Sequence, residues 1–329
     1  MGKIFDFFSN NKNKDKDRND DIGVTKEQVE KEKKLGFSTF FKLLRRSFGK
    51  LTGLNLIIVL CNFPILLFLY GLSGNLNPTI NAPVNPLFVQ LYGIMQNEIS
   101  PLTASLNGIV GITTEVQIIT TASKILMYSG LLLIFTLGIS SIGMSYVMRN
   151  IVRSEYVSVW HDFFGAIKKN FKQGIVLSIL DGVVILLLAY DIVAYSANSG
   201  DFVMNIFYFS IILISIIYFI MRYYMYIMVV TFDLKLKKII KNSFLLSILG
   251  FRRNLSAVLG SVFLIVLSLY IYVLLPTTGI LLPFIFTISL INFIGIYCVY
   301  PIIVKYMVEP YYDEHPDEKP NIPDQEPIL

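Results

Sequence analysis

Blocks of about 20 consecutive apolar residues recur along this chain, and they constrain its fold more than any other feature. A helix of about 20 residues crosses a hydrocarbon core roughly 30 Å thick. Helices suit lipid because all their backbone hydrogen bonds are made internally. Hydrophobic residues make up 54% of the chain, and the excess over a soluble domain lies in these blocks. The pattern predicts an all-α, polytopic membrane protein with six transmembrane helices.

The predicted spans are separated by polar segments and lie within a membrane domain over residues 36–308. Residues 1–35 are rich in charged and amide side chains, and residues 309–329 are acidic and rich in proline, so both tails are predicted to be disordered. Residues 72–124 form one long outer loop, in which several prolines prevent a long helix. The six spans are predicted at 51–71, 125–148, 174–194, 206–228, 255–275 and 281–307.

Lys and Arg are confined to alternate segments of the chain. Of 28 such residues, 26 lie in the first 50 residues, in the loops after the second and fourth spans, or near the C-terminus. The intervening loops, 72–123, 195–205 and 276–280, contain none. Because cytoplasmic segments carry an excess of Lys and Arg, both termini and both basic loops are predicted to be cytoplasmic, in a plasma membrane. The net charge of +5 is therefore a topology signal, and no nucleic-acid partner is predicted.

The first basic loop, Ser154–Gln173, has apolar residues at steps of three and four, which predicts an amphipathic helix. This helix either rests on the membrane surface with Trp160 as its anchor, or docks a partner protein. Around its apolar stripe we single out Val157, Trp160, Asp162, Phe164, Ile167 and Phe171. A second interfacial helix is predicted after the fourth span, with Asp233 as its N-cap.

Four polar side chains within the spans form a candidate intramembrane site, because polar groups are costly in lipid. Asn55 and Asn62 are seven residues apart in the first span and share a helix face. Asp181 and Arg222 each lie roughly 10 Å from the cytoplasmic side, at 1.5 Å per residue, and are close enough in depth to pair. Two interpretations remain: a structural ion pair, with snorkelling of Arg222 as its variant, or a substrate or proton site.

No motif predicts catalysis, a cofactor or a metal site. The chain has no Gly-x-x-x-x-Gly-Lys phosphate loop, no His-Glu-x-x-His, and no nucleophile accompanied by a base. Cys61 and Cys298 lie in apolar blocks, and His161 and His315 are far apart in sequence. We therefore expect a protein that is not an enzyme.

Three motifs, in this order, resemble the YesL-like family of bacterial membrane proteins. The first runs from Lys50-Leu-Thr-Gly-Leu-Asn-Leu to Cys61-Asn-Phe-Pro64. The second comprises Met148–Glu155, Trp160-His-Asp-Phe-Phe164 and Lys168–Gln173, and the third joins Arg222-Tyr-Tyr, Thr231-Phe-Asp-Leu and Lys241-Asn-Ser243. Positions singled out from these motifs are Arg149, Asn150, Arg153, Asn170, Tyr223, Phe232, Asp233 and Asn242.

The resemblance covers most of residues 36–308 and implies a multi-span accessory protein without catalytic residues. Members of the family often lie in carbohydrate-uptake gene neighbourhoods, beside binding-protein-dependent transporters. The preferred hypothesis is an accessory or regulatory protein that contacts a sugar transporter through residues 154–173. Two alternatives stay open: a small transporter or channel lined by Asp181, Arg222 and Asn62, and a scaffold or sensor whose outer loop binds a ligand. The lipid bilayer is a partner in every case.

Overall fold

The computed structural model describes residues 35–83, 100–102, 105, 113–197 and 202–314. Nearly all of these residues are helical, as predicted. The chain forms two compact units, unit 1 (residues 1–62 and 134–329) and unit 2 (residues 63–133). Residues 1–34 and 315–329, on which most of the predicted disordered tails fall, lie outside the described residues.

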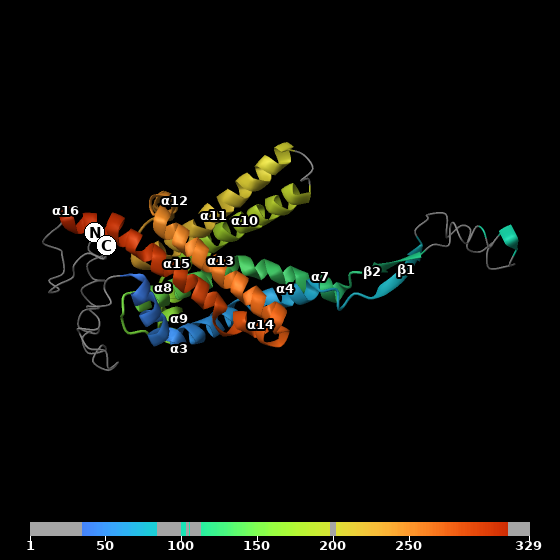
Figure 1. Cartoon of the computed structure of the whole chain (residues 1–329), viewed down its shortest axis with the longest axis horizontal. Coiled ribbons are helices and arrows are strands. Elements are labelled where there is room, and N and C mark those ends of the chain that lie inside the picture. The colour runs from blue at the N-terminus through green and yellow to red at the C-terminus, as the bar shows by residue number, and fades with distance from the viewer. Residues whose placement is uncertain (1–34, 84–99, 103–104, 106–112, 198–201, 315–329) are drawn as a thin grey trace. The chain divides into compact units, whose positions relative to one another are not determined.

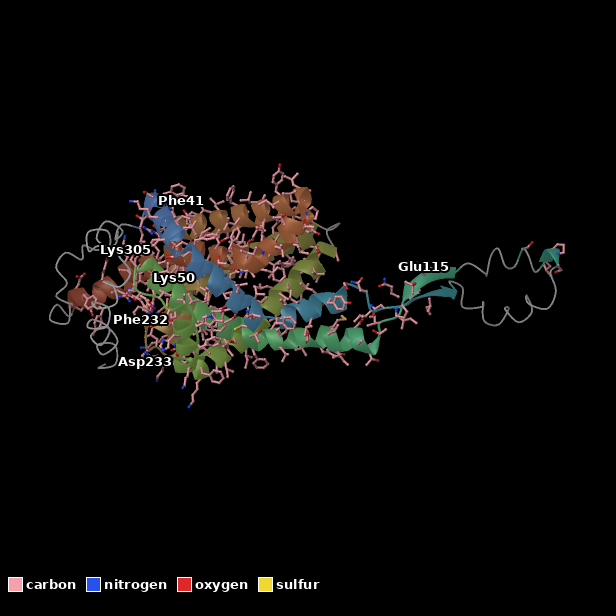
Figure 2. The ribbon with its side chains drawn as sticks, turned by 90° about the horizontal axis from the view of Figure 1, so that it is seen from below. Phe41, Lys50, Glu115, Phe232, Asp233 and Lys305 are labelled. Atoms are coloured by element: carbon pink, nitrogen blue, oxygen red, sulfur yellow. The ribbon has the colours of Figure 1, made fainter. Side chains whose placement is uncertain are left out.

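Unit 1 is a bundle of long helices with two shorter ones, α9 and α12, at one end (Figure 1). The end at which α3, α10 and α13 begin and α8 and α11 end carries most of the described Lys and Arg residues, and we call it the basic end (Figure 2). The helices up to the fifth span are α3 (Phe37–Cys61), α8 (Leu133–Val152), α9 (Val159–Lys169), α10 (Phe171–Ala197), α11 (Phe202–Thr231), α12 (Leu236–Leu249) and α13 (Phe251–Leu274). The last span combines α14 (Pro276–Leu282), the π-helix η2 (Pro283–Thr287), α15 (Ile288–Ile303), the π-helix η3 (Val304–Val308) and α16 (Glu309–Glu314).

Among the described residues, 5 helices are long and apolar enough to cross a membrane, and a sixth results if α3 and α4 (Pro64–Leu72) count as one broken span. This agrees with the six predicted apolar blocks and makes the chain a multi-pass membrane protein. Pro64 stands at the start of α4, where its missing N–H leaves no hydrogen bond unmade. The five unbroken spans are Thr121–Val152, Phe171–Ala197, Phe202–Thr231, Phe251–Leu274 and Pro276–Glu314.

Two predicted boundaries need correction, and one helix extends beyond its predicted span. Helix α3 begins at Phe37, upstream of the predicted span 51–71, because Leu43, Ser47 and Leu51 continue its buried face through the charged segment. The acidic tail was predicted to be disordered from residue 309, but α16 continues the last helix to Glu314. The predicted helix over 154–173 is divided between α9 and the first turn of α10, with Asn170 ending α9.

The core of unit 1 forms around the second half of α11, in which every residue from Tyr223 to Val230 is buried. Small residues bring α10 close to α8: a Cβ on Gly138 would lie 2.5 Å from the Ser178 Cα, and one on Gly182 would lie 2.9 Å from Ile134. Since Gly174, Ser178 and Gly182 recur every four residues, they form one face of α10, a spacing that favours close helix packing in membranes.

Unit 2 contains α4, a β-hairpin and the helices α7 (Thr121–Ser129) and η1 (Gly130–Leu132). Strands β1 (Thr79–Pro83) and β2 (Thr113–Gln117) pair antiparallel, with Ile80 opposite Val116. The predicted outer loop, 72–124, therefore includes a hairpin and the start of α7. The two strands are five residues long, and 29 residues separate them, so no short turn motif joins them in the sequence. For that reason the hairpin was not predicted. Most of the segment between the strands lies outside the described residues.

Candidate functional site

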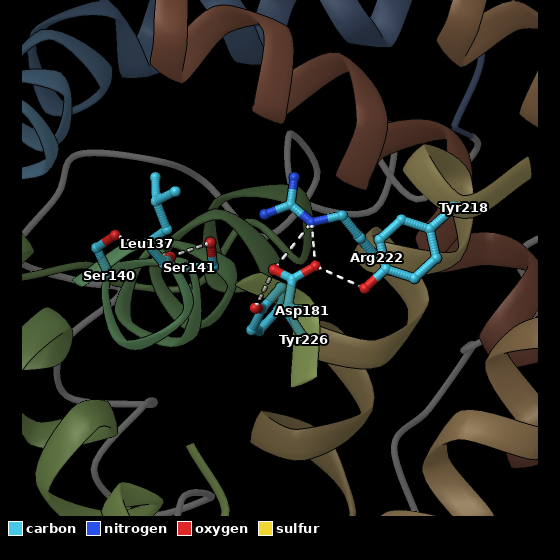
Figure 3. Close-up of polar contacts among 7 residues, drawn as sticks. All are labelled: Leu137, Ser140, Ser141, Asp181, Tyr218, Arg222 and Tyr226. Atoms are coloured by element: carbon cyan, nitrogen blue, oxygen red, sulfur yellow. Dashed lines mark hydrogen bonds and ion pairs between the residues drawn. The ribbon is translucent and has the colours of Figure 1, made fainter. Parts of the chain in front are cut away.

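A buried carboxylate joins α10 to α11 in the middle of unit 1. Asp181 is 1% exposed, and three side chains of α11 surround it (Figure 3). Arg222 donates from Nε to both carboxylate oxygens, at 2.8 and 3.0 Å. The hydroxyls of Tyr218 and Tyr226 each donate to one oxygen, at 2.8 and 2.6 Å. The sequence-predicted pair is thus present, within a cluster of four side chains.

The sequence places these groups together by simple helical spacing. Tyr218, Arg222 and Tyr226 are four residues apart, so they lie on one face of α11. On α10, Asp181 lies beside Gly182, which belongs to the face packed against α8. Close approach of α8 and α10 keeps that side of the carboxylate free of lipid, while α11 supplies the donors.

The cluster is electrically neutral, and both carboxylate oxygens are paired. Each Asp181 oxygen accepts from one tyrosine hydroxyl, and the two oxygens share the single Nε–H of Arg222. Ion pairing with several hydrogen bonds is what makes a charge tolerable inside a low-dielectric region. Arg222 is 23% exposed, and its two Nη atoms point away from Asp181 (Figure 3). The arrangement can therefore fix α10 against α11, and it leaves donors on the far side of the guanidinium.

Asn55 belongs to a different place in the bundle. Its Nδ2 donates to the carbonyl oxygens of Pro283 and Phe284, at 2.8 and 2.7 Å, and its Oδ1 accepts from the Ser289 N–H at 2.8 Å. These backbone groups belong to η2 and the start of α15. A π turn misaligns the regular ladder of backbone hydrogen bonds, and the Asn55 amide satisfies the groups that the turn leaves.

Asn62, the other predicted amide, ends α3 and points to α8. Its Nδ2 donates to the Ile58 carbonyl at 2.9 Å and to Ser140 Oγ at 3.0 Å, while Oδ1 is buried without a partner within the described residues. Neither Asn55 nor Asn62 hydrogen-bonds to the ion pair. Of the four predicted residues, the structure therefore brings together only Asp181 and Arg222.

Arg149, identified from the family resemblance, closes the end of a neighbouring helix. It is 1% exposed, and its Nη1 donates to the Val230 carbonyl at 3.0 Å and to Thr231 Oγ1 at 3.1 Å. Nε and Nη2 donate to Asn150 Oδ1, at 3.2 and 3.0 Å. The carbonyls at a helix C-terminus lack intrahelical partners and carry partial negative charge. Arg149 thus caps α11 from α8.

The predicted docking stripe on α9 divides between two faces. Phe163, not part of that stripe, is fully buried and lies where a Cβ on Gly143 would collide with its ring. Trp160 is 60% exposed and stacks on Phe164 at 5.6 Å between ring centroids. Asp162 accepts from the Ser158 N–H at 2.9 Å, which stabilises the first turn. Of the remaining stripe residues, Val157 is buried, Ile167 is half-buried and Phe171 is exposed.

Most of the other positions taken from the family resemblance lie at the basic end, and Tyr223 lies deeper in the bundle. Arg153 pairs with Glu155 at 2.8 Å, and the Asn170 side chain donates to the Ala166 carbonyl at 2.9 Å. Tyr223 is buried in α11, where its ring occupies the space beside Gly295. Asp233 is exposed and does not cap α12, whose N-cap is Lys235, so that prediction is wrong. Phe232 follows α11 (Figure 2), and Asn242 lies in α12.

Sequence reasoning missed four contributors to these contacts: Tyr218, Tyr226, Gly143 and Asn254. For the two tyrosines, their spacing of four residues from Arg222 was the available signal. Asn254 accepts from the Tyr224 hydroxyl at 2.8 Å and donates to the Leu246 and Ser247 carbonyls at the end of α12. No sequence motif marks that role.

Comparison with known proteins gives a family match. A family model described as "Protein of unknown function, DUF624" matches residues 121–192, and the YesL-like proteins belong to that family. The match runs from α7 into α10 and includes Arg149, Trp160, Asn170 and Asp181. No curated protein and no solved structure matches the chain.

Proposed function

We propose that this chain is an accessory or regulatory membrane protein of a carbohydrate-uptake system, and that the exposed face of α9 contacts the transporter. The observation that carries the proposal is the exposed Trp160–Phe164 stack on a short helix at the basic end. The carbohydrate link rests on the resemblance to YesL-like proteins. The excess of Lys and Arg supports a cytoplasmic position for the basic end.

The α9 surface has the properties of a prepared contact site. Phe163 is fully buried beneath the helix, and the outer rings of Trp160 and Phe164 stack on each other at 5.6 Å between centroids. Large aromatic side chains dominate the binding energy of protein interfaces, and ordering them in advance lowers the entropy cost of association. The pairing of both Asp181 oxygens within the cluster supports an accessory role as well, since a solute would have to displace a donor that is already bound.

The test is quantitative recovery of a transporter with the tagged full-length chain in mild detergent. The W160A/F164A variant should recover about tenfold less of a co-purifying sugar permease than the unaltered chain does. The F244A/F251A variant is the matched control, because those two rings are also exposed at the basic end, on α12 and α13. Recovery of the chain alone, or equal recovery of the permease by both variants, contradicts the proposal.

A second candidate function is a small-solute carrier, favoured by the partial exposure of Arg222 and the direction of its Nη atoms. A guanidinium fork binds carboxylate or phosphate groups, so the cargo would be anionic. Uptake of an anionic solute into liposomes by the purified chain, abolished in R222Q, would establish this function. Liposomes that stay empty while the permease still co-purifies would reject it in favour of the accessory role.

A further inference from the structure

The β-hairpin of unit 2 has one apolar face and one polar face. Ile80 and Val116 lie opposite each other on the apolar face, where their side chains are 46% and 42% exposed. Asn81 and Glu115, the next pair, project from the polar face, because successive side chains of a strand alternate. A hairpin of two strands is marginally stable in water, and a third strand or a helix normally completes it. The hairpin therefore has the form of an unfinished sheet.

The root of the hairpin is fixed within unit 2. Asn77 Oδ1 accepts from the Thr120 N–H at 3.2 Å and from the Ser123 hydroxyl at 2.6 Å. These bonds join the segment before β1 to the first turn of α7, and the hairpin projects from the end of the α4–α7 pair (Figure 1). A strand edge that is held in this way loses less entropy when a partner binds.

The register of the hairpin shows which backbone groups remain open. In an antiparallel pair of strands, hydrogen-bonded residue pairs alternate with pairs that exchange no bonds. The bond from the Ile118 N–H to the Pro78 carbonyl, at 3.0 Å, marks one bonded pair. Two residues further along each strand, Ile80 and Val116 form the next one. Residues at the alternate positions direct their N–H and C=O groups away from the opposite strand.

Strand β2 has the longer open edge. Thr113, Glu115 and Gln117 occupy the alternate positions, so each has an outward N–H and an outward C=O group. On β1 one of the corresponding residues is Pro83, which has no N–H to donate. Within the residues that the structure describes, the sheet consists of these two strands, and nothing pairs with either edge. A further strand can therefore bond along the whole of β2.

Charge limits the kind of strand that fits this edge. Glu115 stands at its centre, is exposed, and forms no ion pair with any residue that the structure describes. Residues 72–123 contain no Lys or Arg, so the segment that forms the hairpin has no cation of its own. A second copy of the chain does not fit, because the register that pairs all of β2 with another β2 sets two Glu115 carboxylates opposite each other. A strand with Lys or Arg at its centre forms an opposite-charge pair instead.

We propose that β2 binds an extended, basic segment of another protein, which is added to the hairpin as a third strand. A Lys or Arg of that segment lies opposite Glu115, and β-branched residues on either side of it extend the apolar row of Ile80 and Val116. In this mode of recognition, main-chain hydrogen bonds give affinity and alternate side chains give specificity. Because residues 72–123 are predicted to be outside the membrane, the partner is an external protein. The α9 surface and the family resemblance play no part in this assignment.

Residue-resolved amide hydrogen exchange of the full-length chain in mild detergent tests the proposal. The probe is the peptide acetyl-Thr-Thr-Val-Lys-Val-Thr-Thr-amide, and its twin with Glu in place of Lys is the comparison. The Lys peptide should slow exchange at Glu115 and Gln117 several-fold, because their N–H groups point outward. Exchange at Val116 should stay unchanged, because its N–H is already bonded to β1. The Glu twin should give little protection at any of the three positions.

Three variants separate strand addition from other contacts. E115K should reverse the preference, so that the Glu peptide protects more than the Lys peptide. T113P removes an outward N–H of β2 and should weaken protection by the Lys peptide. N81P removes an outward N–H of β1 and is the matched control, since neither proline takes part in a bond between the two strands. Exchange at Val116 reports whether the hairpin persists in each variant.

Four results would overturn the proposal. Slow exchange at Glu115 and Gln117 without peptide would show that the edge is already paired within the chain. No protection by the Lys peptide would show that the edge does not accept a strand, and equal protection by both peptides would show that charge does not select it. Equal effects of T113P and N81P would place the peptide elsewhere.

Discussion

Two arginines of unit 1, Arg149 buried and Arg222 partly exposed, are satisfied in different ways. Arg149, at the basic end, donates to a helix C-terminus and to the amide of its neighbour Asn150. Arg222, further into a predicted span, binds the carboxylate of Asp181. The first arrangement keeps a net positive charge, which the roughly half-unit negative end of α11 and the Tyr146 ring, 4.8 Å from the guanidinium, offset in part. The second arrangement is neutral.

The difference follows from position along the helices. Arg149 lies in the last turn of α8, beside the C-terminal carbonyls of α11, which carry partial negative charge and accept from its side chain although it is buried. Arg222 lies inside a predicted span, where a lone charge costs roughly 3 kcal/mol or more, and it pairs with a full countercharge. Four variants break or sharpen this comparison, each assayed by unfolding of the purified chain in mild detergent.

Asp181→Ala should have the largest effect, a loss of about 3–5 kcal/mol, because it leaves the buried Arg222 charge uncompensated. Arg222→Ala should also destabilise the chain, and the double variant D181A/R222A should lose less than the sum of the two. Strictly additive losses in this double-mutant cycle would show that the pair is not coupled.

Arg149→Met should cost about 2–3 kcal/mol, because it removes the donors to the Val230 carbonyl and the Asn150 amide but leaves no buried charge behind. Arg149→Lys keeps the charge without the fork and should recover less than half of the loss. Full recovery with Lys would mean that charge, rather than the directed hydrogen bonds, matters at this position.

Tyr226→Phe should cost about 1.5 kcal/mol, since it removes a hydrogen bond to a charged group and leaves the ring in place. Tyr270→Phe on the exposed face of α13 serves as the control and should leave the unfolding midpoint unchanged. A loss as large as that of Asp181→Ala would mean that the hydroxyl, and not Arg222, is what keeps the carboxylate buried.

Thr231→Val should have the smallest effect, about 0.5–1 kcal/mol. It removes only the side-chain acceptor of Arg149 Nη1, and the Val230 carbonyl still accepts from the same nitrogen at 3.0 Å. A loss equal to that of Arg149→Met would place the main anchor of Arg149 on the hydroxyl instead of the helix end.

The spans and the Asp181–Arg222 contact could be predicted because lipid permits few alternatives. An apolar block of about 20 residues that crosses lipid has to be a helix, because its backbone hydrogen bonds must be made internally. Two opposite charges at equal depth are stabilised by pairing with each other. The role of Arg149 could not be predicted, because its acceptor is the carbonyl of Val230, 81 positions away, and a backbone carbonyl has no sequence signature. The two amides of the first span share a predicted face, yet their partners come from different helices, which one sequence does not specify.

The α9 prediction shows a further limit of periodicity. Trp160 and Phe164 form one apolar series, and Val159, Phe163 and Ala166 form another, displaced by one residue. Both fit helical spacing, and only the presence of Gly143 on α8 decides which series is buried. Whether the outer series contacts lipid or a protein stays a prediction.

The π turn η2 sets the rotation of α14 about its axis, and Asn55 stabilises that turn. A π turn holds one residue more than an α turn, and each residue of an α-helix advances about 100° around its axis. Removing a single residue between Pro283 and Thr287 would let the helix run on regularly, but every side chain of α14 would then face about 100° away from its present direction. One amide on α3, by satisfying the carbonyls of Pro283 and Phe284, thereby fixes which side of α14 meets the lipid.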